Sequence, residues 1–248
     1  MKRKALIISY PGKVGADNYC NGVYVDANRY KEFLTSPLGG AWYESEVKYL
    51  DTPSRDSVLS EIDALKQYDY TMVFFSGHGY YSRRSESTIL EINNNEVIDS
   101  MDFRRGSTKR SIIVDACRQV YEEPVFEAAR KAMKFAEARA NFDSCRRYYE
   151  TLIDKCSSGV VVGYACGVDE TAGESSSRGG YYSSSLVKTS EEWSESGHFD
   201  LSSHYYHQSI VKVHNSAALK VNSLSGGTQH PEIDKPRSEP YFPFAIMA

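Results

Sequence analysis

The sequence has no long apolar run and no excess of basic charge. Of its 248 residues, 29 are Lys or Arg and 33 are Asp or Glu, which gives a formal net charge of −4. A protein that binds the phosphates of a nucleic acid needs a basic surface, so this balance argues against that partner. No stretch is long enough to cross a bilayer, and the apolar run that begins at Ala5 is too short for a signal peptide. We therefore expect a cytoplasmic protein with neither a nucleic-acid nor a membrane partner.

Paired cysteines are also missing. The cysteines are odd in number, widely spaced and free of any Cys-x-x-Cys pair, which argues against a disulfide framework and against a zinc site. Three histidines late in the chain stand at no strong ligand spacing, so we expect no metal there. Thiols in a reducing compartment remain available for chemistry. The cysteines are Cys20, Cys117, Cys145, Cys156 and Cys166, and the three histidines are His198, His204 and His207.

Apolar segments that suit buried strands alternate with segments of helical periodicity. Near-continuous apolar strands separated by helices predict an α/β fold, with a mostly parallel sheet covered on both faces. The expected strands are residues 5–9, 45–51, 71–75, 110–117 and 158–166.

The second half of the chain is more polar. Neither an internal repeat nor a domain linker is visible, so we expect a single domain over residues 1–248. The expected elements are a helix over 125–155, a Ser/Gly-rich loop over 170–185, a polar stretch to about His207, a helix over 208–224 and a terminal strand over 241–247.

A histidine between two glycines follows the third expected strand, and a cysteine ends the fourth. If these strands are neighbours, His78 and Cys117 face each other across one crevice, as a cysteine nucleophile and its histidine base require. Gly77 and Gly79 allow a sharp turn and the close approach of a substrate carbonyl. The N–H groups of Gly79 and Cys117 would then stabilise the oxyanion. A lone buried cysteine or a lone histidine is usually structural, but this pairing favours catalysis.

At these residues the chain resembles the caspase and metacaspase superfamily of cysteine peptidases. The resemblance rests on Ser76-Gly77-His78-Gly79 and Asp115-Ala116-Cys117-Arg118, each after an apolar strand, and it extends over nearly the whole chain. It implies a caspase-type α/β/α sandwich with a mostly parallel six-stranded sheet, in which His78 and Cys117 are the catalytic pair. It also implies a large-subunit-like part over about 1–120, a helical linker over about 121–157 and a small-subunit-like part over about 158–248.

The resemblance also implies a substrate preference. Metacaspases cleave after basic residues, and the residues here that match their S1 pocket are Asp26, Ser76 and Asp115, with Val23 in the wall. Two carboxylates suit a planar guanidinium, so we expect cleavage after Arg, with Lys second. The chain departs from metacaspases at Val23, where many carry a second cysteine, and after Cys117, where Arg-Gln replaces His-Ser.

The sequence therefore predicts a cysteine endopeptidase that acts on proteins or peptides, and the resemblance suggests a triggered effector of bacterial defence or programmed cell death. A catalytically silent scaffold and a ligand-binding signalling module stay open as alternatives. No cofactor is expected, although calcium, a small-molecule messenger or an activating partner remains open as the trigger. We expect a monomer, because Pro243 lies in the terminal strand and would weaken pairing at its edge.

Overall fold

A computed structural model describes residues 1–119, 142–196 and 205–247. The expected helix over 125–155 lies partly outside the described residues. His198 and His204 lie outside them. The part of that helix that is described, α3 (Phe142–Lys155), is helical as expected.

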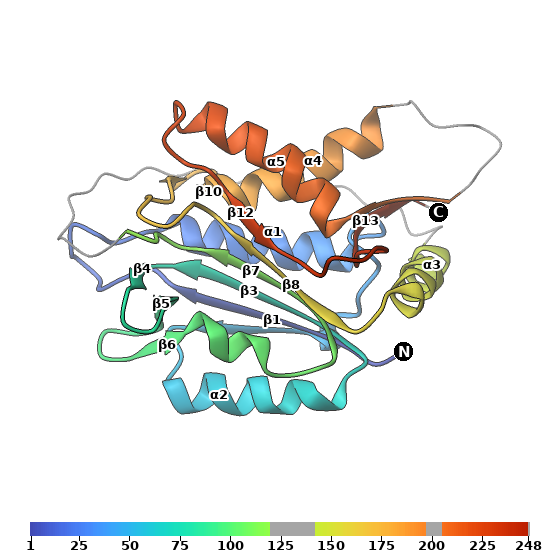
Figure 1. Cartoon of the computed structure of the whole chain (residues 1–248), viewed down its shortest axis with the longest axis horizontal. Helices are drawn as coiled ribbons and strands as arrows, with labels where there is room; N and C mark the ends of the chain where they lie inside the picture. The colour runs from blue at the N-terminus through green and yellow to red at the C-terminus, as the bar shows by residue number, and fades with distance from the viewer. Residues whose placement is uncertain (120–141, 197–204, 248) are drawn as a thin grey trace.

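A six-stranded sheet forms the centre of the molecule (Figure 1). Its strand order is β12-β8-β7-β3-β1-β2, in which β12 is antiparallel to its neighbour and the other pairs are parallel. The expected α/β fold with a mostly parallel sheet is thereby confirmed. The strands are β1 (Arg3–Tyr10), β2 (Val47–Asp51), β3 (Tyr70–Gly77), β7 (Lys109–Asp115), β8 (Gly159–Tyr164) and β12 (Glu232–Asp234).

Helices cover both faces of this sheet (Figure 1). Alternate residues of β1 show the two layers, because Ala5 and Ile7 belong to one buried core and Leu6 and Ile8 to the other. The first core includes side chains of α1, α3, α4 and α5, and the second includes those of α2 and the 3₁₀ segment η3. The bounds are α1 (Gly22–Thr35), α2 (Arg55–Ala64), α4 (Tyr181–Glu195), α5 (Ile210–Leu224), η1 (Glu44–Glu46), η2 (Leu65–Gln67) and η3 (Ser100–Arg104). Within the described ranges, no helix has the length and apolar character needed to cross a membrane.

The prediction of a Ser/Gly-rich loop over 170–185 was only partly correct. The loop contains a short hairpin, β9 (Glu174–Ser175) and β10 (Gly179–Gly180), and the chain then enters α4 at Tyr181. Serines are moderate helix formers, so the run of three after Tyr182 suggested a loop. In the structure these serines are buried, and Asp115 accepts hydrogen bonds from the N–H and hydroxyl of Ser183 in the first turn of α4. Tertiary contacts therefore override the local preference.

The expected terminal strand exists, but it does not belong to the central sheet. Strand β13 (Pro243–Met247) pairs antiparallel with β11 (Tyr206–Ser209) in a separate two-stranded sheet. The sixth strand of the central sheet is β12, which the sequence pattern did not reveal because it has only three residues. A second small sheet, also not expected, follows β3 and contains β4 (Gly79–Ser82), β5 (Ser87–Glu91) and β6 (Val97–Asp99).

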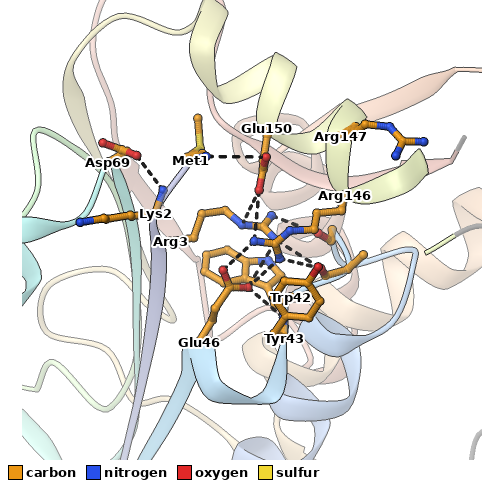
Figure 2. Close-up of polar contacts among 12 residues, drawn as sticks. Met1, Lys2, Arg3, Trp42, Tyr43, Glu46, Asp69, Arg146, Arg147 and Glu150 are labelled. Carbon is orange, nitrogen blue, oxygen red and sulfur yellow. Dashed lines mark hydrogen bonds and ion pairs between the residues drawn. The ribbon is translucent and has the colours of Figure 1, made fainter. Parts of the chain in front are cut away.

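A buried arginine connects the start of the chain to α3 (Figure 2). Arg3 is 1% exposed, and its guanidinium lies 4.4 Å from the ring centroid of Trp42. Glu46 lies 3.5 Å and Glu150 of α3 lies 3.6 Å from nitrogens of this guanidinium. Arg146 of α3 donates to both oxygens of Glu46, each at 2.7 Å. We call these five residues the Arg3 cluster; a buried charge is tolerated here because it is paired and stacked on an aromatic ring.

Candidate active site

The parallel pairing of β3 with β7 places the two expected catalytic residues at one edge of the sheet. Ser76 is the register partner of Asp115, at the end of both strands. His78 and Cys117 each stand two residues further along the chain, so they leave adjacent strands together. Both are partly exposed. The prediction that these strands are neighbours is confirmed.

His78 is oriented by the loop that follows β1. Its Nε2 lies 3.3 Å from the carbonyl oxygen of Pro11, and the edge of its ring meets Tyr10 with centroids 6.2 Å apart. A carbonyl oxygen only accepts, so this contact places the proton of the neutral ring on Nε2 and leaves Nδ1 as the basic atom. Gly12 has φ +91°, and a Cβ there would stand 2.8 Å from Nε2 of His78. Glycine is therefore required at this position both by its backbone conformation and by the close approach.

Cys117 holds its sulfur against the backbone of Ala172. The Ala172 N–H donates to Sγ at 3.4 Å, and Sγ lies 3.8 Å from the Ala172 carbonyl oxygen. Burial raises the pKa of the Cys117 thiol, and the negative charges of Asp115 and Glu174 raise it further, while the Ala172 N–H acts in the opposite direction. Burial therefore favours the neutral thiol of Cys117 over its thiolate.

Asp26 is the first of the two expected pocket carboxylates, and α1 presents it to the end of β3. It is 1% exposed and accepts a hydrogen bond from the Ser76 hydroxyl at 2.7 Å and from the Gly180 N–H at 3.0 and 3.1 Å. Arg29 is 3.4 Å away on the same helix. Burial raises the pKa of Asp26 well above its usual value, and the charge of Asp115 adds to this effect.

Asp115 is the second carboxylate, and it is also buried, at 5% exposure. Both of its described donors come from Ser183: the N–H at 2.8 Å and the hydroxyl at 2.6 Å. Burial raises the pKa of Asp115 to about 6, and the charge of Glu174 contributes in the same direction. No arginine or lysine makes a salt bridge with Asp115 in the part of the chain that the structure describes.

The hairpin β9–β10 covers both carboxylates. A Cβ on Gly179 would stand 2.0 Å from Oδ1 of Asp26, and a Cβ on Gly180 would stand 2.2 Å from Oδ2 of Asp115. Only glycine allows the backbone to lie this close to the two acids. The structure thus brings Asp26, Ser76 and Asp115 together as expected, beneath this hairpin. Val23 is buried on the first turn of α1, at 2% exposure.

Two features of the site were not found from sequence. The first is Glu174 on β9, whose charge raises the pKa of Cys117 and of Asp115. Burial raises the pKa of the Cys20 thiol, and the charge of Glu174 and a hydrogen bond to it raise that pKa further. The second is the carbonyl of Pro11, which accepts from His78. A main-chain carbonyl leaves no signal in the residue type, whereas Glu174 could have been suspected because it lies in the loop expected over 170–185 of the small-subunit-like part.

Metal binding finds no support around these residues. Across residues 1–119, 142–196 and 205–247 no group of three or more His, Cys, Asp or Glu side chains could hold a metal ion. His207, one of the three late histidines, has its Nδ1 3.0 Å from the Tyr148 hydroxyl, on the surface of α3.

Comparisons with known proteins identify the family and agree with the fold. The model of the caspase domain family matches residues 2–242, so the chain belongs to the caspase domain family, a class of cysteine peptidases. Among solved structures, the crystal structure of caspase-1 from Spodoptera frugiperda is similar in fold, with a TM-score of 0.58 and 11% sequence identity over 94% of this chain and 86% of that chain. No curated protein is similar enough in sequence to count as a relative.

Proposed function

We propose that this protein is a cysteine endopeptidase in which Cys117 is the nucleophile and His78 is the general base and acid. The observation that carries the proposal is the joint exit of both residues from the paired strands β3 and β7, in a chain of the caspase domain family. The carbonyl of Pro11 supports the role of His78, because it holds the ring in the tautomer whose Nδ1 can take a proton.

The reaction follows from the chemistry of these groups. Nδ1 of His78 takes the proton of the Cys117 thiol as sulfur attacks the scissile carbonyl, and the N–H groups of Gly79 and Cys117 hold the oxyanion. The C–N bond breaks as His78 gives the proton to the leaving amine, which leaves a thioester on Cys117. A water molecule then attacks the thioester with His78 as base. The C–S bond breaks, the acid product leaves, and the proton on His78 returns to the sulfur of Cys117.

Specificity for Arg, with Lys second, is the finer part of the proposal. Asp26 and Asp115 are buried acids with raised pKa values, so a nearby cation would stabilise the charged form of each. Asp26 has Arg29 as a partner, whereas among the residues that the structure describes the donors to Asp115 are the neutral groups of Ser183. Glu174 adds a third negative charge near Cys117. An arginine side chain that reaches these acids would supply the missing positive charge, and an aspartate would be repelled.

The resting arrangement also suits a triggered enzyme. The thiol of Cys117 is neutral, and the hairpin that contains Gly179 and Gly180 covers the two acids. Substrate access to Asp26 and Asp115 therefore requires this hairpin to move. We place the protein among triggered effectors of bacterial defence or programmed cell death, with calcium, a small-molecule messenger or a partner protein as the trigger to be tested.

The test is selective alkylation combined with peptide cleavage. Iodoacetamide should modify Cys117 and abolish the cleavage of a peptide library, and in Cys20→Ala, which removes the other partly exposed thiol, alkylation of Cys117 should still abolish cleavage. A protein that is alkylated at Cys117 but cleaves no peptide, with or without candidate triggers, would instead support the silent scaffold.

A further inference from the structure

A short segment near the end of the chain holds the loop that contacts the nucleophile. Gln229 is buried, at 1% exposure, and both ends of its amide are used. Its Oε1 accepts from the Gly173 N–H at 2.9 Å, and its Nε2 donates to the Ala165 carbonyl at 2.8 Å. A buried amide with both ends satisfied fixes the two backbone segments relative to each other.

The next residue contacts the same loop. The His230 N–H donates to Oε2 of Glu170 at 2.8 Å, and its Nδ1 lies 2.7 Å from Oε1. The same carboxylate accepts from the Gly167 N–H at 3.0 Å. The Glu170 carbonyl in turn accepts from the backbone N–H of Arg118 at 3.0 Å. Arg118 is the residue after Cys117.

The third contact reaches Arg118 from strand β12. Glu232 forms an ion pair with the guanidinium of Arg118. Arg118 is 7% exposed. Its guanidinium also donates to the Thr88 hydroxyl at 3.0 Å and to the Cys166 carbonyl at 3.1 Å. The same group lies 4.3 Å from the ring centroid of Tyr164. Arg118 is thus fixed on several sides, and its single described counter-ion is Glu232.

Both backbone segments next to the sulfur are therefore held from residues 229–232. Arg118 follows Cys117 directly, and Gly173 follows Ala172, whose N–H donates to Sγ. We propose that Gln229, His230 and Glu232, which we call the 229–232 brace, are positioning residues that set the distance between the Cys117 sulfur and the Ala172 N–H. This proposal rests on the proposed role of Cys117 as nucleophile. It adds that the 229–232 brace positions the Cys117 sulfur.

The test compares Gln229→Ala and Glu232→Gln with wild type. Loss of the brace should weaken the Ala172 N–H contact that favours the thiolate, so the midpoint of the pH dependence of Cys117 alkylation should move to higher pH. We expect kcat to fall about ten-fold or more while KM changes little, because a misplaced nucleophile affects the chemical step. Glu232→Gln keeps the size of the side chain but removes the described counter-ion of the buried Arg118, so the Tm of each variant is measured alongside.

Matched controls exist in the same molecule. Asp234, on the same strand, is ion-paired with Arg104 instead of Arg118. Gln208 on β11 is another buried glutamine, at 8% exposure. Asp234→Asn and Gln208→Ala should match wild type in the alkylation midpoint and in kcat, even if either lowers Tm. If the brace variants lower Tm but leave the midpoint where the controls have it, the brace is structural only and the proposal is wrong.

The alkylation readout separates this proposal from the proposed function. A chain that cleaves no peptide can still show the shift at Cys117, which would support the brace and overturn the peptidase assignment. A chain with normal cleavage and no shift in any brace variant would overturn the brace and leave the peptidase assignment standing.

Discussion

His78 donates its Nε2 proton to the carbonyl oxygen of Pro11, 3.3 Å away, so a main-chain carbonyl orients the ring of the proposed general base, where many nucleophilic triads use a carboxylate. The contact depends on how closely the loop after β1 can approach the imidazole. That approach is possible because residue 12 has no side chain.

Gly12→Ala should therefore impair catalysis, because its methyl group would stand 2.8 Å from Nε2 of His78 and displace the ring. We expect kcat to fall about a hundred-fold, with alkylation of Cys117 preserved. Gly15→Ala is the matched control: Gly15 also has a positive φ, of +81°, but no atom lies within 4 Å of its Cβ position. If both variants lose the same activity, backbone strain and not the contact with His78 is the cause.

The acid pair should determine specificity at the residue before the cleaved bond. Asp26→Asn and Asp115→Asn keep the size and an acceptor oxygen but remove the charge that would balance an arginine. Loss of one partner of a desolvated charged pair costs about 2–5 kcal/mol, or roughly thirty- to several-thousand-fold in kcat/KM for Arg substrates. Asp99→Asn is the control, because Asp99 also accepts from a hydroxyl and a backbone N–H, but its donors are Ser87 and Met101 and not residues of the proposed pocket. Preference for Asp before the cleaved bond in a positional-scanning library would contradict the pocket assignment.

The same pocket should make substrate binding depend on pH. Burial raises the pKa of Asp115 to about 6, so its negative charge is complete well above that pH and is lost as the pH falls through it. KM for an Arg substrate should therefore rise as the pH drops from about 8 to about 5. Asp115→Asn should show a higher KM with a weaker dependence on pH over this range. A wild-type KM that stays constant across it would mean that Asp115 does not meet the substrate.

The sequence predicted the parts of this site that depend on strands. Apolar runs identified β3 and β7, and parallel pairing then required His78 and Cys117 to meet at one edge. Asp26 and Ser76 could be matched only through the family resemblance, because a helix residue and a strand residue fifty positions apart give no local sign of their 2.7 Å contact.

Other parts could not be predicted, for physical reasons that differ. The carbonyl of Pro11 is a backbone group that any residue carries. Strand β12 is too short to show alternation, and α4 starts in a serine run whose hydrogen bonds to Asp115 come from tertiary structure. Arg3 lies in a basic terminal sequence, yet it is buried. Its burial could not be predicted because its partners Glu46 and Glu150 are distant in the chain.

The expectation of a monomer now rests on a different strand. Pro243 cannot limit pairing at the edge of the central sheet, because β13 is not part of that sheet. At the end of the sheet opposite β2, the edge strand is β12, which has three residues and carries the charged side chains of Glu232 and Asp234, 53% and 55% exposed. Short, charged edge strands resist pairing with another copy. Sedimentation at micromolar concentration should show one monomeric species, and a stable dimer across that range would refute the prediction.

Self-cleavage should follow the same preference for basic residues. The expected sites are the basic residues between Val125 and Lys155 and the bond after Arg178. The structure disfavours the latter, because Arg178 lies in the β9–β10 hairpin and its carbonyl accepts from Arg29. A protease binds its substrate in an extended form, so this hairpin would first have to open. The same argument disfavours the part of 125–155 that forms α3, so we expect cuts between 125 and 141 to precede any cut after Arg178.

The Arg3 cluster should keep the two fragments together after a cut between residues 125 and 141. Arg3 and Glu46 lie before the cut and Arg146 and Glu150 after it, so the cluster joins the two fragments, together with the shared central sheet (Figure 2). Gel filtration should show both fragments eluting together, and denaturing mass spectrometry should show two chains that end and begin at a basic site. Cys117→Ala should remain intact under the same conditions. Cuts found only after acidic residues would contradict the assigned specificity, and fragments that elute separately would show that the cluster and sheet do not hold the cleaved chain together.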